Sequence, residues 1–254
     1  MSIPSVVQQY VNDHSYPLVF ATLSGAHLYG FPSPDSDYDI RGSHVLPLPD
    51  VVGLTTSNET VDRTQVIDGV EVDIVTHDFR MFCNLLLRKN GNVLEQIFSP
   101  IVLHTTPEHE ELKAIAQNCI TRHHIYHYAG FAHTKWKHVQ SAETVQVKPL
   151  LYLFRVLLTG IHLLRTGKVE ANLLHLNEDA KLPYIADLVQ QKQTGPEKGA
   201  AATANMAFFE SEYERLRAEM TQASEESHLP EHPSGEPALN DLLIRLRMKT
   251  MHSE

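Results

Sequence analysis

The chain has 254 residues, 42% of them hydrophobic and 20% charged, which suits a soluble globular protein of one large or two small domains. The formal net charge of −10 excludes a wholly basic nucleic-acid coat, but a local basic strip would still allow a nucleic-acid enzyme. The two cysteines and sixteen histidines show no metal-ligand spacing and no disulfide framework.

The N-terminal stretch MSIPSVVQQYVNDHSYP has no basic region followed by a long apolar core, so it predicts no signal peptide. The longest apolar stretch, near 150–164, is interrupted by Arg155, Gly160 and His162 and is expected to be too short and too polar for a membrane span. We therefore expect a cytoplasmic protein with no membrane partner. The sequence leaves the oligomeric state open.

The first part of the chain is predicted to form strands and turns. Residues 4–13 predict a short helix, and PLVFATLSG predicts a strand that ends at Ser24-Gly25. One helical turn over 25–30, a loop at FPSPDS and a second strand at DYDIRGSHVLP follow. The segment VDRTQVIDGVEVDIVTHD predicts a hairpin, because Asp68-Gly69 is a strong two-residue turn signal.

From Asp78 onward the pattern is helical. Asp78 suits a helix N-cap and Gly91 a helix stop, and NVLEQIF predicts a second short helix. Further helices are expected in five places: from Pro107, over 119–140, over 146–166 up to Gly167, over 201–223, and at PALNDLLIRLRMKTM. The segment NLLHLNEDAKLPYIADLVQ is expected to be a partly helical connection, QKQTGPEKGA a loop and SHLPEHPSGEP a linker. We expect an α+β domain over residues 1–103 and a helical, substrate-binding domain over 104–254.

Three acidic residues are the strongest candidates for a functional site. Asp37 and Asp39 lie two residues apart, a spacing that places both carboxylates on one face of a strand. Asp73 lies in the second strand of the expected hairpin, inside VEVDIVT. Three carboxylates carried by strands are typical of two-metal phosphoryl transfer.

Each part of this pattern also has a structural explanation. Alternating acids are common on a solvated strand face. Asp73 lies between valines and isoleucines, where a buried carboxylate requires a partner, and a shared metal would supply one. Gly25 and Gly30 allow a close backbone approach, and the hydroxyl of Ser24 or Ser36 could bind phosphate.

With these residues together, GAHLYGFPSPDSDYDIRG resembles the signature of the DNA polymerase β nucleotidyltransferase superfamily. It is most similar to the minimal-type nucleotidyltransferases of RNA-repair operons. Tyr29-Gly30 matches the aromatic-Gly of the pattern, and the run from Ser36 to Arg41 matches Ser-Asp-x-Asp-x-Arg. The family's Gly-Ser is replaced by Gly25-Ala26, with a serine one position earlier at Ser24.

The resemblance implies metal roles for Asp37, Asp39 and Asp73, with Mg²⁺ (or Mn²⁺) as the cofactor and an NTP as the substrate. It also implies a mixed polymerase-β-like sheet flanked by helices, followed by an all-helical domain. The residues expected to bind the nucleotide come from both parts of the chain: Ser24, Gly25, Tyr29, Gly30, Ser36, Arg41, Lys148, Tyr152 and Arg155.

The cationic candidates have two interpretations each. Lys148, Tyr152 and Arg155 share one helix face, either to bind triphosphate or an RNA end or as cations that snorkel at a helix edge. Trp136, in a strip with His133, Lys135, Lys137 and His138, could stack on a base or belong to the core. Arg41 is expected to organise the site by pairing with a carboxylate or phosphate.

The expected function is transfer of a nucleoside monophosphate from an NTP to an acceptor hydroxyl, with an RNA end as the acceptor by resemblance and pyrophosphate as the second product. Two alternatives stay open. The acceptor could be a protein or a small molecule, or the chain could be a non-catalytic nucleotide- or RNA-binding module.

Overall fold

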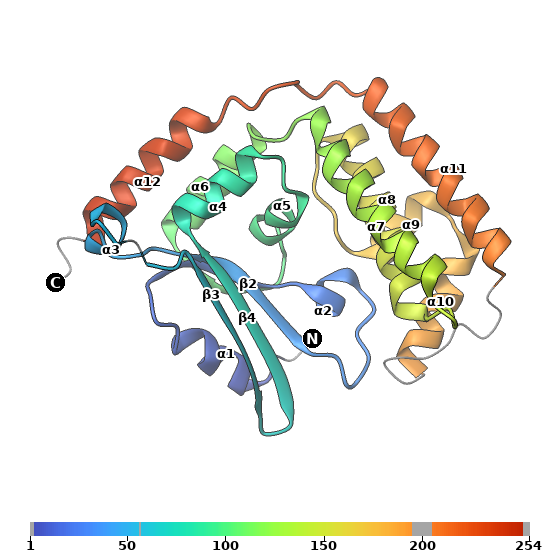
Figure 1. Ribbon diagram of the computed structural model, residues 1–254, viewed down its shortest axis with the longest axis horizontal. Coiled ribbons are helices and arrows are strands. Elements are labelled where there is room, and N and C mark those ends of the chain that lie inside the picture. Colours follow the sequence, from blue (N-terminus) through green and yellow to red (C-terminus); the bar gives the residue numbers. More distant parts are fainter. Residues whose placement is uncertain (1–2, 56, 195–204, 251–254) are drawn as a thin grey trace. The chain divides into compact units, whose positions relative to one another are not determined.

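The computed structural model describes residues 3–55, 57–194 and 205–250 (Figure 1). Parts of the expected loop at QKQTGPEKGA, the start of the expected helix over 201–223 and Met251 lie outside the described residues. The chain forms two compact units, each built from separate stretches. Unit 1 consists of Met1–Gly25, Asp37–Ile120 and His232–Glu254, and unit 2 consists of Ala26–Ser36 and Thr121–Glu231.

This division differs from the expected single boundary between residues 103 and 104. Residues 104–120 and the C-terminal segment belong to unit 1, and the short segment that follows Gly25 belongs to unit 2. The chain therefore crosses between the units four times.

A five-stranded mixed sheet forms the centre of unit 1. Its strand order is β3-β4-β2-β1-β5, in which β2 and β4 are parallel and the other neighbours antiparallel. The strands are β1 (Leu18–Leu23), β2 (Tyr38–His44), β3 (Thr60–Ile67), β4 (Val70–Asp78) and β5 (Val102–Thr105). The expected mixed sheet is confirmed, but β5, a four-residue strand, was not predicted.

Helices cover the two faces of this sheet. On one face, Val7, Tyr10 and Val11 of α1 (Ser5–Asn12) pack on buried strand residues such as Ile40 and Ile74. On the other face, Phe20 of β1 contacts the rings of Phe82 and His109. The remaining helices of unit 1 are α3 (Pro49–Val52), α4 (Phe79–Leu87), α5 (Gly91–Ile97), α6 (Pro107–Gln117) and α12 (Glu236–Thr250).

The turn signals in the sequence are confirmed at several positions. Asp68 and Gly69 have φ values of 51° and 79°, as a two-residue hairpin turn of the β3–β4 pair requires. Asp78 caps α4 by accepting a hydrogen bond from the amide of Arg80. Gly91, however, does not stop a helix: it is the first residue of α5, whose N-cap is Asn90.

The C-terminal helix α12 is joined to the sheet by a buried ion pair. The guanidinium of Arg247 donates to the carboxylate of Asp78 and to the carbonyl of Leu46. The amide of Leu46 donates to the other Asp78 oxygen at 3.0 Å. Asp78 therefore holds the end of β4, the start of α4 and α12 together.

Unit 2 is helical and is organised around α8. This helix is buried over most of its length and packs against α7, α9, α10 and α11. A Cβ atom at Gly160 of α8 would lie 2.7 Å from the Met220 sulfur and 2.9 Å from the Tyr128 Cβ, so glycine permits close helix packing here. The elements are α2 (Gly25–Tyr29, which begins at the end of unit 1), η1 (Arg122–His124), α7 (Ile125–Ser141), α8 (Val147–Thr166), α9 (Leu173–Ala180), α10 (Pro183–Thr194) and α11 (Met206–Glu225).

Two expectations about these helices are corrected. The helix expected over 119–140 begins at Ile125, after the 3₁₀ turn η1. By length and composition α8 does pass as a candidate membrane span, with a mean hydropathy of 1.5, contrary to the expectation from Arg155, Gly160 and His162. However, 78% of its apolar window is buried inside the protein, and a core helix passes the same test.

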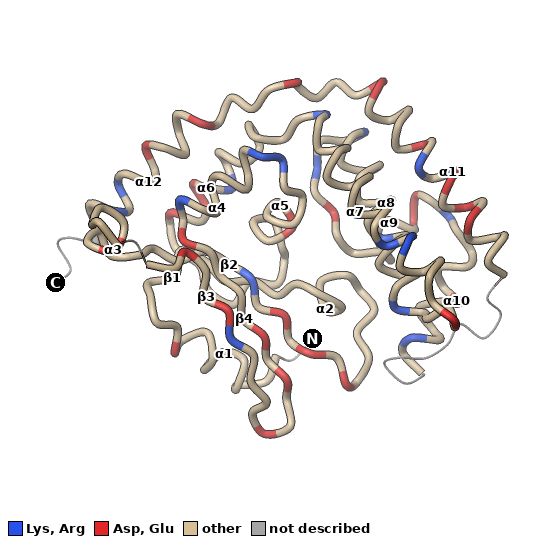
Figure 2. Tube along the Cα trace, in the orientation of Figure 1, with Lys and Arg blue, Asp and Glu red and all other residues tan. Residues whose placement is uncertain are grey.

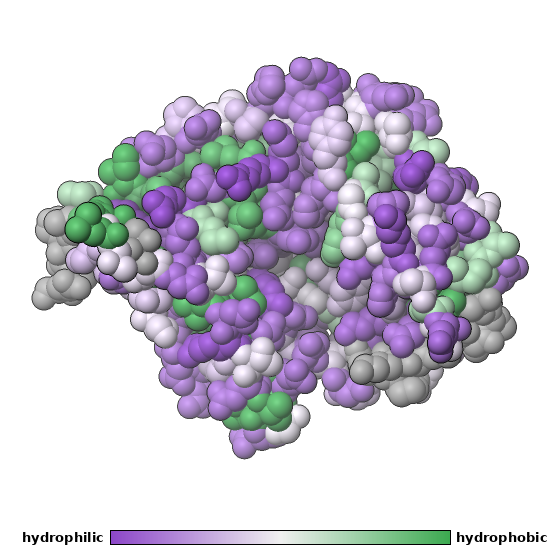
Figure 3. Space-filling model, in the orientation of Figure 1, coloured by the Kyte–Doolittle hydropathy of each residue, from purple (hydrophilic) through white to green (hydrophobic). Residues whose placement is uncertain are grey.

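Apolar surface is scattered rather than gathered into one large patch on the face shown in Figure 3. In unit 1 the exposed large apolar side chains include Val52 and Leu54 near α3 and Val66 near the hairpin turn. Both cysteines, Cys83 and Cys119, are free and buried.

Candidate functional site

Two carboxylates face each other across neighbouring parallel strands of unit 1. Asp39 of β2 is the register partner of Asp73 of β4. Their strand neighbours Ile40 and Ile74 point into the core beneath α1, so the two acids point to the opposite face. Each acid side chain is 20% exposed. Like charges directly opposite in a sheet repel, so this pair requires a cation between its members.

Arg41, two residues after Asp39 on the same strand, supplies that cation. Its Nη2 donates to Asp39 Oδ1 at 2.8 Å and to Asp73 Oδ2 at 2.7 Å. Its Nη1 donates to the carbonyl oxygens of Ile40 at 2.8 Å and Asp73 at 3.3 Å. Figure 2 shows acidic positions on both β2 and β4 and a basic position on β2.

Thr64 completes the surroundings of Asp73 and was missed by the sequence analysis. Its hydroxyl donates to Asp73 Oδ1 at 2.8 Å from the register position opposite in β3. A register count outward from the Asp68-Gly69 turn would have found it, because a two-residue turn fixes the pairing of a hairpin.

These contacts correct the argument that Asp73 is buried and needs a metal partner. The strand alternates, and Asp73 lies on its half-open side with Arg41 and Thr64 as partners. Among the described residues, no group of three or more His, Cys, Asp or Glu side chains is arranged to hold a metal ion. Asp37 lies just before β2, which begins at Tyr38. The metal roles of Asp37, Asp39 and Asp73 therefore stay a prediction.

The turn before the acids lies directly against Asp39. Gly25 has φ +60°, and a Cβ atom there would lie 1.9 Å from Asp39 Oδ2. Only glycine allows the turn to lie this close to the Asp39 carboxylate. The amide of Ser24 donates to the carbonyl of Asp39 at 2.8 Å, so this amide belongs to the fold and the Ser24 hydroxyl is the group left for a ligand. Carboxylate oxygens are hard ligands, the kind that a divalent cation such as Mg²⁺ takes.

In unit 2, cations gather around two tyrosines. The Arg155 guanidinium carbon lies 3.9 Å from the centre of the Tyr29 ring, and Arg155 is only 1% exposed. Tyr29 meets Tyr152 edge to face at 5.5 Å. The ammonium groups of Lys135 and Lys148 lie 5.6 and 5.9 Å from the Tyr152 ring centre. Arg155 is therefore a buried cation and does not snorkel at a helix edge.

The electrostatics of this group favour an anion. Burial, followed by the positive charges of Arg155 and Lys148, lowers the pKa of Lys135. Three cations that disfavour one another's charge are typical of a site that binds a polyanion. Sequence analysis placed Lys135 in another strip and did not connect it with Lys148 and Arg155.

The remaining predicted residues of unit 2 hold its N-terminal loop. Ser36 Oγ accepts a hydrogen bond from the Ser33 amide at 2.9 Å, and the buried Lys192 donates to Ser33 Oγ at 2.6 Å. Gly30 has φ +87°, and a Cβ atom there would lie 2.3 Å from the side-chain oxygen of Asn172. No sequence motif marks Lys192, which lies in a polar helical run.

Trp136 belongs to the core of unit 2. It is 4% exposed and stacks on Tyr213 with ring centres 5.0 Å apart. This packing agrees with the core interpretation and leaves no open ring face of Trp136 for a base within unit 2.

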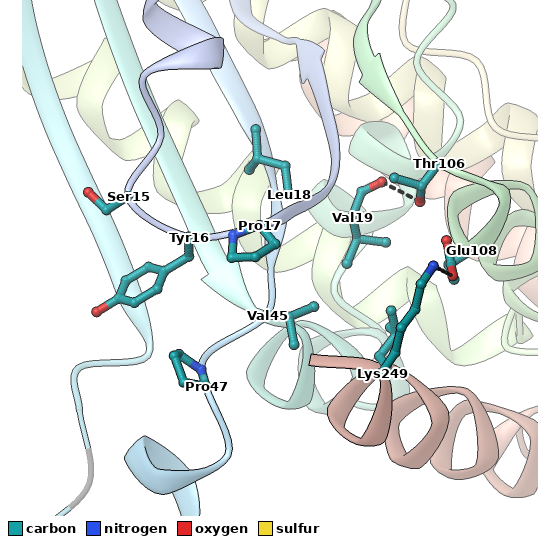
Figure 4. A pocket seen from close by; sticks show the side chains of 11 residues that line it. Ser15, Tyr16, Pro17, Leu18, Val19, Val45, Pro47, Thr106, Glu108 and Lys249 are labelled. Carbon is teal, nitrogen blue, oxygen red and sulfur yellow. Dashed lines mark hydrogen bonds and ion pairs between the residues drawn. The ribbon is translucent and has the colours of Figure 1, made fainter. Parts of the chain in front are cut away.

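A separate cavity of about 500 Å³ lies in unit 1, at the end of β1 away from Ser24 (Figure 4). Its lining is mainly apolar, with an ion pair of 2.9 Å between Lys249 and Glu108 at one side. None of the residues that line it is a predicted site residue.

The comparisons with known proteins identify the family of this chain. The family model described as RlaP, RNA repair pathway DNA polymerase beta family, matches residues 2–245, and the chain belongs to this family. The expected relationship to polymerase β nucleotidyltransferases is therefore confirmed.

Two curated relatives are similar in sequence. An uncharacterized protein of Methanocaldococcus jannaschii is 32% identical over 158 residues, which cover 61% of this chain and 63% of that protein. The uncharacterized protein YcgL of Bacillus subtilis is 26% identical over 211 residues, covering 78% of this chain and 79% of its own length. A solved nucleotidyltransferase-like protein from Exiguobacterium sibiricum matches with a TM-score of 0.33 and 11% identity, over 87% of this chain and 73% of that chain.

Proposed function

We propose that this chain is a metal-dependent nucleotidyltransferase that acts in the cytoplasm and transfers NMP from an NTP to an RNA end. The observation that carries the proposal is the pair of opposed carboxylates, Asp39 and Asp73, beside the glycine turn at Gly25, in a chain of this family. The family supports nucleotidyl transfer and an RNA-repair context. The RNA end as acceptor is our inference.

In this reaction the acceptor hydroxyl oxygen forms a bond to the α-phosphorus of the NTP. The bond between that phosphorus and the oxygen bridging to the β-phosphate breaks, and pyrophosphate leaves with the electron pair. Two Mg²⁺ (or Mn²⁺) ions held by Asp37, Asp39 and Asp73 would neutralise phosphate charge and lower the pKa of the acceptor hydroxyl.

The chain's own residues would bind and orient the reactants. Asp73 would take the acceptor proton on Oδ2 once Arg41 has released that oxygen, while Thr64 continues to donate to Oδ1. Gly25, which has no side chain, would let the backbone approach the nucleotide phosphates beside Asp39, and the Ser24 hydroxyl would donate to them.

In unit 2, Lys135 and Lys148 would bind phosphate groups of the nucleotide or RNA, and the buried Arg155 would add positive charge behind them, since a polyanion needs such charge in an acidic protein. Tyr29 and Tyr152 hold these cations in place through their ring faces.

The test is incubation of the full chain with Mg²⁺, each α-labelled NTP in turn, and total RNA or tRNA. We expect label on RNA, removed by nuclease, and a loss of about 100-fold or more for Asp39→Asn and Asp73→Asn. Glu71→Gln is the matched control, because Glu71 lies on the same face of β4 as Asp73 but is exposed, near the start of the strand. It should keep the wild-type rate.

Label that resists nuclease and migrates with a polypeptide would move the proposal to a protein acceptor. Wild-type protein that labels no acceptor, with Asp39→Asn indistinguishable from it, would contradict nucleotidyl transfer.

One observation favours a second function, a non-catalytic nucleotide-binding module: Arg41 already pairs with one oxygen of each carboxylate, Asp39 Oδ1 and Asp73 Oδ2. Calorimetry separates the two functions. NTP binding that needs no Mg²⁺ and survives Asp39→Asn would favour the module.

A further inference from the structure

The cation between Asp39 and Asp73 is part of the chain. The four hydrogen bonds of the Arg41 terminal nitrogens end on four acceptors of β2 and β4: two carboxylate oxygens and two backbone carbonyls. The carbonyl contacts fix Nη1, and the planar guanidinium then directs Nη2 at both carboxylates. This arrangement offsets one of the two negative charges of the acid pair without any metal.

A divalent cation cannot share these two oxygens with the guanidinium. Mg²⁺ binds carboxylate oxygen at about 2.0–2.1 Å and requires near-ideal octahedral geometry. Nη2 lies 2.8 Å from Asp39 Oδ1 and 2.7 Å from Asp73 Oδ2, in the space between them. Placing a second cation there would bring two positive charges together in a half-buried position.

We propose that Arg41 is a positioning residue that competes with a divalent cation for Asp39 and Asp73, and that an anion must accept its guanidinium before the cation binds tightly. The identity of that anion, a nucleotide phosphate, rests on the proposed function. The competition itself rests only on the contacts of Arg41.

The anion follows from charge balance. A displaced guanidinium loses two charge-assisted hydrogen bonds, and phosphate oxygens replace them in bidentate geometry. A metal–triphosphate complex delivers both charges at once: its cation takes the carboxylates and its phosphates take Arg41. Binding of the metal and of the nucleotide is therefore positively coupled, and by linkage each strengthens the other.

The experiment measures Mn²⁺ affinity of the full chain without nucleotide, from the electron paramagnetic resonance signal of free Mn²⁺. We expect Arg41→Gln to bind Mn²⁺ about tenfold more tightly than wild type, because the competitor is gone. The double variant Asp73→Asn with Arg41→Gln should lose that gain, which locates the ion at the acid pair. A purely structural role for Arg41 would weaken Mn²⁺ binding instead.

Arg80→Gln is the matched control. Arg80 pairs with Glu59 at 3.0 Å on a more exposed part of unit 1, so its removal also releases a carboxylate from an arginine. Mn²⁺ affinity of this variant should equal that of wild type. A gain in Arg80→Gln as large as that in Arg41→Gln would overturn the proposal.

Arg41→Gln leaves two opposed carboxylates and could lower the stability of the fold, so melting temperatures are measured with and without Mn²⁺. We expect Mn²⁺ to raise the melting temperature of Arg41→Gln by more than that of wild type. If this variant fails to fold, Arg41→Lys takes its place in the experiment. Lysine keeps the positive charge but lacks the planar guanidinium that contacts both carboxylates, so this variant should also bind Mn²⁺ more tightly than wild type.

Mn²⁺ affinity no higher than wild type in the folded variant overturns the proposal. Because this readout needs no catalysis, the two proposals fail separately. If the wild type labels RNA and Arg41→Gln has unchanged Mn²⁺ affinity, only the proposed competition between Arg41 and the cation is contradicted. If Arg41→Gln gains Mn²⁺ affinity but the wild type labels no acceptor, only the proposed nucleotidyl transfer is contradicted.

Discussion

His44 is a residue whose protonation affects the stability of unit 1. It is fully buried, its Nδ1 lies 2.8 Å from the Thr76 hydroxyl, and its ring stacks on Tyr16. Burial, and then the nearby charge of His14, lowers the pKa of His44 to about 4, although Asp78 acts in the opposite direction. The folded protein therefore favours the neutral ring.

We predict that acid weakens the fold through this residue. Above the unfolded pKa of 6.5 both states hold a neutral ring, and as pH falls toward 4 only the unfolded state takes up the proton. His44 should then cost up to about 3 kcal/mol of unfolding free energy by pH 4. His44→Gln should show a smaller loss between pH 6.5 and 4, measured by urea unfolding at several pH values.

The control is His133→Gln, which removes an exposed histidine from α7. Its pH dependence should match wild type. A wild-type slope that persists unchanged in His44→Gln would refute the assignment. Part of the slope remains in every variant, because the half-buried His14 and the buried His109 also have a lowered pKa.

The residues of the candidate site were predicted unevenly. The motif spacing indicated Asp39, Asp73, Arg41 and Gly25, because period-two strands and glycine turns are local features. The pairing of Arg41 with both acids depends on the parallel register of β2 with β4, which are separated by a hairpin strand, and one sequence does not fix such a register.

At the scale of elements, the packing of α8 rests on Gly160. We predict that Gly160→Ala lowers the unfolding free energy by about 1–3 kcal/mol through overpacking, because the Tyr128 Cβ cannot move aside as the Met220 sulfur can. Gly130→Ala on α7 is the matched control, because a Cβ there meets nothing within 4 Å. It should stabilise by about 0.5–1 kcal/mol.

Chemical denaturation of both variants checks this pair. Equal effects of the same sign at the two positions would show that helix propensity, and not contact with α7 and α11, determines the cost.

Elements with local signals were predicted well, and elements formed by distant contacts were not. The Asp68-Gly69 hairpin, the Asp78 cap and the Gly167 helix end all depend on residues close in sequence. The strand β5 has four residues and exists because β1 offers an edge, so its own sequence carries little signal.

At the scale of the whole molecule, the return of the C-terminal segment to unit 1 was not predictable. It depends on the ion pair between Arg247 and Asp78, which are 169 residues apart. We predict that Arg247→Gln lowers the unfolding free energy of the protein by about 3–5 kcal/mol, because Asp78 is left charged and buried.

Arg245→Gln is the control, since Arg245 pairs with Glu111 and Asp241 on the exposed side of the same helix. Its urea midpoint should stay close to wild type. If the two variants have equal midpoints, the buried pair does not hold α12 to the sheet.

The same pair has a consequence for biosynthesis. Asp78 leaves the ribosome 169 residues before Arg247, a delay of roughly 10–30 seconds at usual rates of elongation. During this interval the nascent sheet carries a carboxylate and a strand end whose partner has not yet been made. Unit 1 therefore completes its fold only after unit 2 has been synthesised.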